Sequence, residues 1–290
     1  MSVKSVIFNF AKKAYVCSAF VIPGYLGKRF RCEVSEQMVV IDEIKTIYGK
    51  IKYFCFGHIS LWRSKTLFSK EPEMIEWLDA IPKMTGNKPT IFWDIGANIG
   101  LYSVYAGIKG LNVFAFEPSA LNTLFLSKNI EINGLKDSVI LYPIAVSDKS
   151  EFGFLNMSST QLGGAFNEFS DENLQKVGQG DYEMSVVFRQ GMFSYSIDEL
   201  VCKYGFEAPN FIKIDVDSIE DKIIYGAKEV LSRDNCVKSI FVELDEFDLR
   251  TQEVIKFLSD KGFELKAKKH SDLFNDSKFK TQFNYIFERE

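Results

Sequence analysis

One stretch, residues 90–118, constrains the fold of this 290-residue chain more than any other. It reads TIFWDIGANIGLYSVYAGIKGLNVFAFEP. An apolar run is followed by a glycine turn at 96–100, a segment with helical spacing at 101–108 and a second apolar run at 112–116. Strand, tight turn, helix and parallel strand in this order form half of a doubly wound nucleotide-binding fold, in which ligands bind at the carboxyl ends of the strands.

The turn and the acid after the second strand indicate the kind of ligand. A sharp turn whose backbone a ligand approaches closely favours glycine, because a side chain would block both the turn and the approach. Glu117 follows Gly96 by 21 residues and stands at the tip of the second strand. A carboxylate there can accept hydrogen bonds from both ribose hydroxyls, so the spacing favours a ligand that contains adenosine.

The glycine spacing separates two classes of ligand. A dinucleotide fingerprint has glycine at positions 1, 3 and 6 of the turn, where this chain has Gly96, Asn98 and Leu101. The pattern D-I-G-A-N-I-G from Asp94 to Gly100 instead resembles motif I of class I S-adenosylmethionine (SAM) methyltransferases. In that motif Asp94 would hold the amino end of the ligand, and the backbone of the turn would lie under it. The plainer alternative is a generic tight turn with Asn98 as a helix N-cap.

The rest of the chain continues the alternation of strands and helices. We expect helices at 71–81, 119–132, 196–204, 218–231 and 247–261, and strands at 39–44, 51–56, 139–146, 184–188, 211–216, 239–242, 263–268 and 283–288. Residues 150–193 look less regular, and Ser218 with Asp221 resembles a capping box. A break at Pro82 and residues 85–89 divides the chain into an N-terminal extension, 1–85, and a SAM-binding domain, 86–290.

These elements predict an α/β, Rossmann-like class I methyltransferase fold. Its core would be a mostly parallel seven-stranded sheet with helices on both faces. The extension would add packing, cover the acceptor or mediate pairing, and a homodimer is left open.

Several segments, in their order and spacing, resemble the FkbM-type methyltransferases. They are WDIGANIGLYS, VFAFEPSALNTLFLSKNIEING, ILYPIAVSD, SYSIDEL, FIKIDVDSIEDKIIYGA and IFVELD. The resemblance runs from about residue 91 to 287 and implies SAM-dependent O-methylation, often of sugar hydroxyls in glycans, polysaccharides or natural products. The family usually has K-I-D-V-E-G-A-E where this chain has KIDVDSIE, so Asp217 is one methylene shorter and Ser218 replaces a glycine.

Twelve residues are expected to hold SAM. They are Asp94, Gly96, Ala97, Asn98, Gly100, Glu117, Pro118, Ser119, Ala145, Val146, Ser147 and Asp148. The last four stand at the carboxyl end of the third predicted strand, where the adenine ring is usually met. Asp148 would accept from the exocyclic amine of adenine or would simply begin a turn.

A sugar hydroxyl is a poor nucleophile and needs a general base or a metal ion that lowers its pKa. Asp215, Asp217 and Glu243 are the candidates, since all three stand at adjacent strand tips. The D-x-D arrangement of Asp215 and Asp217 also resembles the acidic segment of metal-dependent O-methyltransferases, and such oxygen ligands would suit Mg²⁺. Lys213 points the same way as Asp215 along the strand and would line the site or neutralise that acid.

Charge and composition narrow the possible partners, metal sites and membrane segments of this protein. A net charge of −4 gives no reason to expect a nucleic-acid partner. The five cysteines are scattered without a C-x-x-C pair, which favours reduced thiols in a cytoplasmic protein and not a zinc site. Residues 3–26 are apolar, but Lys12, Lys13 and Pro23 interrupt them, so they are too short to span a bilayer. A packed helix is favoured there, and contact with a membrane surface is left open.

Two other functions compete with methyl transfer. A nicotinamide oxidoreductase would need the second and third glycines that the turn lacks. A non-catalytic scaffold that keeps the fold is suggested only by the altered Asp217-Ser218 segment.

Overall fold

The structure, a computed structural model, describes residues 3–18, 22–86, 88–178, 183–233, 236–270, 275, 277 and 279–289. The chain divides into two compact units, residues 1–41 and 42–290. The smaller unit contains the helices α1 (Val3–Ser18) and α2 (Gly24–Gln37). Residues 42–85, which were predicted to form part of the N-terminal extension, therefore belong to the larger unit. Their role in covering the acceptor stays a prediction. Within the described ranges no helix is both long and apolar enough to cross a bilayer.

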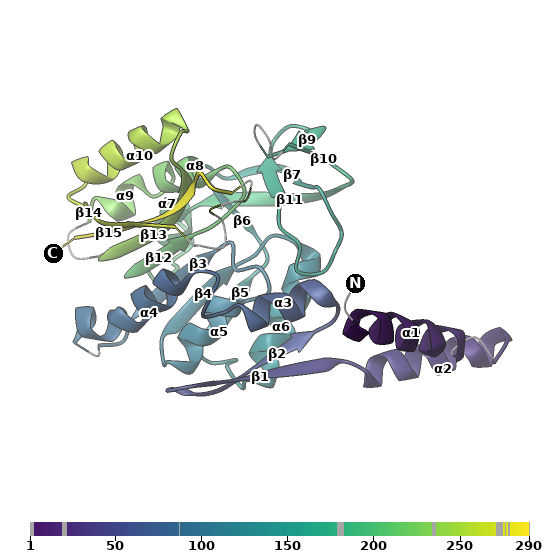
Figure 1. Cartoon of the computed structure of the whole chain (residues 1–290). Helices are drawn as coiled ribbons and strands as arrows, with labels where there is room; N and C mark the ends of the chain where they lie inside the picture. The colour runs from purple at the N-terminus through teal and green to yellow at the C-terminus, as the bar shows by residue number, and fades with distance from the viewer. Residues whose placement is uncertain are drawn as a thin grey trace. The chain divides into compact units, whose positions relative to one another are not determined.

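The larger unit is built on a seven-stranded sheet with the order β14-β15-β13-β12-β3-β4-β5 (Figure 1). The strands are β3 (Ile91–Ile95), β4 (Asn112–Phe116), β5 (Val139–Tyr142), β12 (Phe211–Ile214), β13 (Ser239–Asp245), β14 (Glu264–Lys269) and β15 (Gln282–Glu288). The five strands from β13 to β5 are parallel, and β15 runs antiparallel to both its neighbours. The predicted fold class is confirmed. The strand order reverses between β3 and β12, which is where such folds bind ligands.

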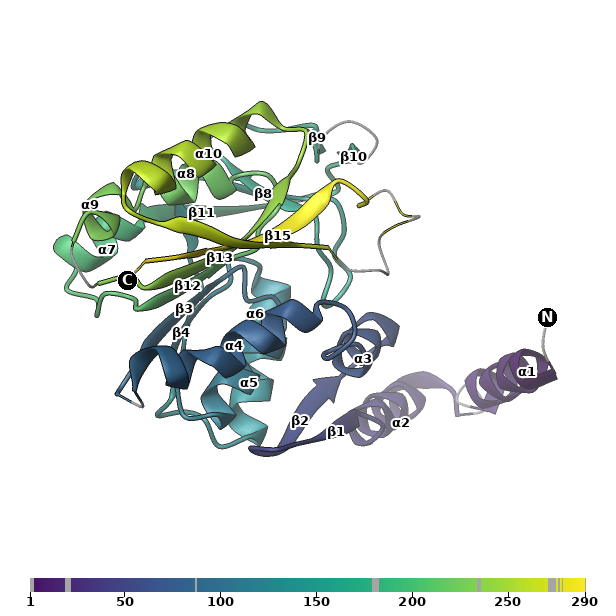
Figure 2. The ribbon, with the colours of Figure 1, turned by 60° about the vertical axis from the view of Figure 1, so that its left-hand side comes forward.

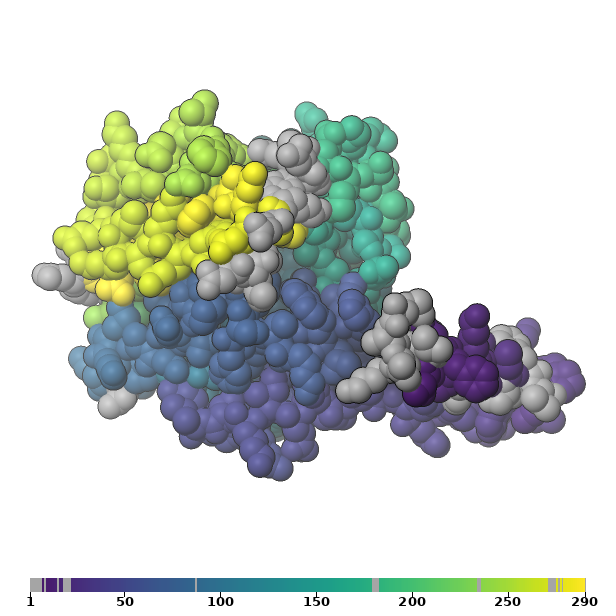
Figure 3. Space-filling model, in the orientation of Figure 1, coloured from purple at the N-terminus to yellow at the C-terminus, as the bar shows by residue number. Residues whose placement is uncertain are grey.

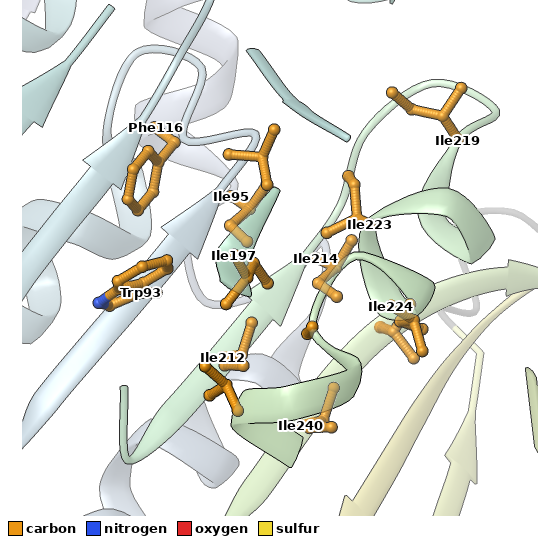
Figure 4. Close-up of a cluster of buried hydrophobic side chains, with 14 of the residues drawn as sticks. Trp93, Ile95, Phe116, Ile197, Ile212, Ile214, Ile219, Ile223, Ile224 and Ile240 are labelled. Atoms are coloured by element: carbon orange, nitrogen blue, oxygen red, sulfur yellow. The ribbon is translucent and has the colours of Figure 1, made fainter. Parts of the chain in front are cut away.

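Helices cover both faces of this sheet (Figure 2). On one face lie α4 (Pro72–Thr85), α5 (Leu101–Ile108) and α6 (Ala120–Ile132), and on the other lie α7 (Ile197–Cys202), α8 (Glu220–Tyr225), α9 (Lys228–Leu231) and α10 (Leu249–Asp260). Figure 4 shows the core of the second face, where Ile212 and Ile214 of β12 meet Ile223 and Ile224 of α8. Because both faces of β12 are covered, its side chains are buried throughout.

Helix α4 is held to the sheet by Trp77. Its ring packs against Phe92, Phe211 and Phe241, which come from three neighbouring strands, with ring centroids 5.5 to 5.9 Å away. Its indole Nε1 donates to Ser239 Oγ at 2.8 Å. In Figure 3 the blue surface of α4 accordingly lies against the yellow-green surface of the C-terminal strands.

The segment before α4 packs on the glycine-turn half of the sheet. It contains a hairpin, β1 (Val40–Thr46) with β2 (Gly49–Cys55), followed by α3 (His58–Lys65). Both strands confirm the prediction. The Tyr53 hydroxyl of β2 donates to the Leu101 carbonyl at 2.8 Å, and the Phe54 amide donates to Asn129 Oδ1 of α6 at 2.7 Å. These contacts place α3 beside the carboxyl ends of the strands.

The prediction of a single strand over 139–146 is wrong. The strand ends at Tyr142, before Pro143, and Ala145–Ser147 form β6, which pairs in parallel with β11 (Phe188–Ser196) in a second sheet. That four-stranded sheet, in the order β6-β11-β7-β8, also contains β7 (Glu151–Met157) and β8 (Asn167–Ser170). The region expected to be irregular thus contains β7 and β8 as well as loops. Of the strand predicted at 184–188, only β10 (Met184–Ser185), which pairs with β9 (Lys176–Val177), and the start of β11 are strand.

Two predicted helix signals are also wrong. Ser218 does not cap a helix: its φ is +92°, Ile219 is the N-cap of α8, and Asp221 instead accepts from Arg250 at 3.1 Å. Pro82 does not end α4, which continues to Thr85. Proline lacks the N–H that would donate to the Leu78 carbonyl, but a last helical turn tolerates this loss, and the Thr85 hydroxyl donates to the Ile81 carbonyl at 3.1 Å.

Replacing Trp77 with alanine should lower the free energy of unfolding by about 3–5 kcal/mol, because it empties the space between α4 and three strands. Urea denaturation followed by circular dichroism measures this value. Trp62→Ala is the matched control, since the Trp62 side chain is 42% exposed, and it should cost far less. Equal losses in the two variants would contradict the packing described for α4.

Candidate active site

The glycine turn brings the ends of β3, β4 and β12 together. The amides of Gly96 and Ala97 both donate to the Phe116 carbonyl at 3.0 Å. Gly96 has φ +81°, and a Cβ built on it would lie 1.9 Å from the Asp215 carbonyl oxygen. A side chain at this position would force the turn away from β12, so the glycine is required by a close approach of backbone to backbone.

Glu117 is fixed beneath this turn by donors of its own chain. Its two carboxylate oxygens accept from the Asn98 amide at 2.7 Å, the Ser119 amide at 2.9 Å and Asn122 Nδ2 at 3.4 Å. Burial raises the pKa of Glu117 to about 7, although these donors oppose the change. Each carboxylate oxygen has two lone pairs, so the group can still accept from hydroxyls of a ligand.

A cavity of about 300 Å³ opens above Glu117 and the glycine turn. Its apolar lining comes from Ile95, Phe116, Ile144, Val146, Leu155, Phe166, Phe169 and Ile219, among others. Its charged lining comes from Arg63, Lys70, Glu117, Asp215, Asp217 and Glu243. A pocket with a large apolar wall and a few convergent charges suits a ligand with a flat ring at one part and polar groups at another.

Asp215 belongs to a buried ion-pair chain. Lys213 Nζ lies 3.2 Å from Asp215 Oδ2 and 3.0 Å from Asp94 Oδ1, and Lys213 and Asp94 are direct neighbours across β12 and β3. Ser103 Oγ donates to the other Asp94 oxygen at 2.5 Å. Burial works to raise the pKa of Asp215, but Lys213 and Lys70 outweigh it and lower that pKa. Burial works to lower the pKa of Lys213, and Asp215 and Asp94 raise it instead. Asp215 is therefore held as a carboxylate.

Asp217 and Glu243 differ from Asp215, because their pKa values are raised. Burial raises the pKa of Asp217 to about 6, and its Oδ2 accepts from the Asn167 amide at 2.7 Å. Burial, followed by the charges of Asp215 and Glu71, raises the pKa of Glu243 to about 8. Three acids close together cannot all ionise easily, so the ionised Asp215 leaves Glu243 able to take up a proton near neutral pH.

The structure brings together nine of the predicted site residues as lining of this cavity: Gly96, Asn98, Glu117, Pro118, Ala145, Val146, Asp215, Asp217 and Glu243. The other predicted residues are not among the lining: Asp94, Ala97, Gly100, Ser119, Ser147, Asp148 and Lys213. Asp94 and Lys213 lie beneath the site and pair with each other. Asp148 is exposed, and its Oδ1 accepts from the Ser147 hydroxyl at 3.2 Å. The roles proposed for these residues in binding stay predictions.

Three lining residues, Trp62, Arg63 and Lys70, come from the segment before the predicted domain. No motif marks them in the sequence. Arg63 Nε donates to the Gly163 carbonyl at 2.8 Å, which ties α3 to the loop between β7 and β8. Asn122 was also missed, and it holds the same loop by accepting from the Gly163 amide at 3.1 Å. An asparagine inside the helix after Glu117 was the one signal that sequence reasoning could have used.

The predicted magnesium ligands Asp215 and Asp217 do not form a metal centre with a third group. In the part of the chain that the structure describes, no three His, Cys, Asp or Glu side chains are placed to share an ion. Lys213 already contacts Asp215, and a backbone amide occupies Asp217. The Lys213 ammonium and the Asn167 amide therefore stabilise the negative charge of the two carboxylates, as a bound metal ion would.

Comparison with known proteins gives the family. Residues 94–265 match the methyltransferase FkbM domain, which is more than half of the chain. This chain belongs to the FkbM methyltransferase family. The glycine turn is therefore that of a methyltransferase and not of a nicotinamide oxidoreductase, and the family implies SAM as methyl donor.

Two curated relatives are each 25% identical to this chain. Methyltransferase sdnD of Sordaria araneosa aligns over 190 residues, 59% of this chain and 73% of its own length. Hexuronic acid methyltransferase AglP of Haloferax volcanii aligns over 170 residues, 59% of this chain and 62% of its own length.

Solved structures of methyltransferases are similar at low identity. The FkbM methyltransferase of Methylobacillus flagellatus has 16% identity and a TM-score of 0.44, covering 68% of this chain and 43% of that one. The magnesium protoporphyrin IX methyltransferase of Synechocystis, crystallised with SAM, has 11% identity and a TM-score of 0.43, covering 80% and 82%. The chain thus spans less than two thirds of the length of AglP and of the solved FkbM protein.

Lys213→Met should lower the free energy of unfolding by about 3–5 kcal/mol, because it leaves Asp94 buried beside no cation. Adding Asp94→Asn to that variant should restore part of the loss. Urea denaturation of the two single variants and the double variant measures the coupling. Lys256→Met, at an exposed position on α10, is the control and should be near neutral. Strictly additive losses would show that Lys213 and Asp94 do not depend on each other.

Proposed function

We propose that this methyltransferase transfers a methyl group from SAM to a hydroxyl of a sugar, in a glycan, a polysaccharide or a glycosylated metabolite. The observation that carries the proposal is the position of Glu243, an acid with a raised pKa, in the lining of the same cavity as Glu117 and the glycine turn. The hexuronic acid methyltransferase among the relatives supports a sugar acceptor.

The residues of the cavity fit SAM. When bound, SAM supplies a methyl group already activated by a sulfonium sulfur. Glu117 would accept from the ribose hydroxyls, and Val146, Leu155 and Phe169 offer an apolar wall to the adenine ring. Asp215, kept ionised by Lys213, would attract the positively charged end of the ligand. In-line transfer from such a donor depends mainly on positioning and on exclusion of water.

Glu243 is the best candidate for the general base. Asp215 is paired with Lys213 and Asp217 accepts from a backbone amide, whereas the charge of Lys70 at Glu243 does not cancel the effect of burial. A base works best when its pKa lies near the operating pH, and the pKa of Glu243 is raised to about 8. Glu243 would take the hydroxyl proton as the acceptor oxygen attacks the methyl carbon. A base of this kind serves the reaction without the Mg²⁺ that the D-x-D pattern suggests.

The proposal puts the acceptor in a second cavity. It measures about 850 Å³ and shares Phe166, Val216, Asp217, Glu243 and Phe279 with the first cavity. The shared acids stand where the two cavities meet. An acceptor in the second cavity would present a hydroxyl to Glu243 while the donor fills the first.

Glu243→Gln should lower kcat by roughly 10²- to 10⁴-fold while calorimetric binding of SAM stays unchanged. The wild-type kcat/KM should rise with pH through about 8, because Glu243 acts only after it loses its proton, and the residual activity of the variant should lack this rise. Release of S-adenosylhomocysteine from a panel of methyl glycosides provides the rate, and nuclear magnetic resonance of the product identifies the methyl ether.

Glu253→Gln is the matched control, because Glu253 is an exposed acid on α10 outside the lining of both cavities. It should keep the wild-type rate and pH profile. Unchanged turnover in Glu243→Gln, or a product methylated on nitrogen or carbon, would overturn the proposal.

A further inference from the structure

The smaller unit, residues 1–41, exposes apolar side chains to an unusual degree. On α1, Ile7 is 62% exposed and Phe10 75% exposed. Ile7, Phe10, Ala14 and Cys17 are spaced by three, four and three residues, so they follow one face of the helix, and all four are exposed. A helix normally buries such a face against another element.

Helix α2 repeats the pattern. Tyr25 is 76% exposed, Leu26 69% and Phe30 46%. Leu26 and Phe30 are four residues apart and lie on one face of the helix. Both helices of the smaller unit therefore carry aromatic and aliphatic side chains that nothing in the described unit covers.

The charge of the unit is opposite to that of the rest of the chain. Residues 1–41 contain six Lys and Arg against two Glu, a net charge of +4. Residues 42–290 contain 29 Lys and Arg against 37 Asp and Glu, a net charge of −8. Lys12 and Lys13 on α1 and Lys28 on α2 are exposed. Basic residues beside exposed apolar ones are typical of helices that lie on a membrane surface.

We propose that α1 and α2 bind the surface of a membrane that contains anionic lipids. Apolar side chains such as Phe10 and Leu26 enter the boundary between headgroups and acyl chains, and Lys12, Lys13 and Lys28 approach the lipid phosphates. Charge complementarity favours an anionic membrane surface over a second copy of the unit. A second copy of the unit would bring one charge of +4 against another, whereas an anionic surface attracts it. The proposal does not depend on the acceptor, and it places the enzyme at a lipid surface whatever hydroxyl it methylates.

Flotation of the full-length protein with vesicles tests the proposal. Vesicles of phosphatidylcholine with 30% phosphatidylglycerol, about a third anionic lipid, should carry the protein upward at low salt. Binding should weaken as salt rises, because the attraction is screened. Lys12→Glu with Lys13→Glu should weaken binding at least about tenfold, and Phe10→Ser with Leu26→Ser should do the same by removing the apolar contact.

Two controls on the larger unit match these changes. Lys228→Glu with Lys256→Glu alters net charge equally at exposed positions, and Phe152→Ser removes an aromatic ring that is 55% exposed. Both should float like the wild type, and circular dichroism verifies that every variant is folded. Absence of wild-type flotation, or equal flotation of all variants, overturns the proposal. Sedimentation showing a dimer that Phe10→Ser dissociates, without lipid binding, would assign the helices to self-association instead.

Discussion

The site depends on one buried cation, the Lys213 ammonium between Asp94 and Asp215. Its side chain is only 2% exposed, and it joins the ends of β3 and β12 at the point where the strand order reverses. A buried charge is tolerated only when partners compensate for the lost water. Here the two carboxylates do so, and Lys213 also donates to the Gly96 carbonyl at 3.3 Å. One side chain thus links the glycine turn, the strand beside it and the first acid of the site.

The acids in the cavity differ in character because of this cation. Asp215 lies beside Lys213 and has a lowered pKa, and its negative charge helps to raise the pKa of Asp217 and Glu243. Pushing the pKa values of neighbouring acids apart is how a site obtains both a permanent anion and a base. Lys213 and Lys70 together offset the charge of Asp215.

Short-range sequence patterns predicted the elements whose bounds depend on local interactions. The bounds of α5 and β4 agree with the helical spacing and apolar run of the sequence, and Glu117 is at the strand tip as expected. The split after Tyr142 was missed because β6 is defined by pairing with β11, about 50 residues later in the chain. No short-range pattern records such a pairing. Ser218 shows the same limit, since its φ of +92° suits the glycine usual in the family, and Arg250 of α10 holds its carbonyl at 3.0 Å.

The positions of the acids were predicted better than the apolar walls of the cavity. Carboxylates at strand tips follow from strand alternation, so Asp215, Asp217 and Glu243 were found together. Asp94 was expected to contact the ligand. Its ion pair with Lys213 was not predicted, because that pair depends on β12 lying beside β3 in the sheet. Arg63 comes from a segment outside the family match, and its position depends on how β2 packs against α6.

Calorimetric titration of SAM and S-adenosylhomocysteine, with NAD as the comparison ligand, tests the central claim most directly. The wild type should bind SAM and S-adenosylhomocysteine and should not bind NAD. Glu117→Gln should weaken both by roughly 10- to 100-fold, because it removes a charged acceptor from the ribose hydroxyls. Binding of NAD without SAM, or unchanged affinity in Glu117→Gln, would contradict the assignment of this cavity to the methyl donor.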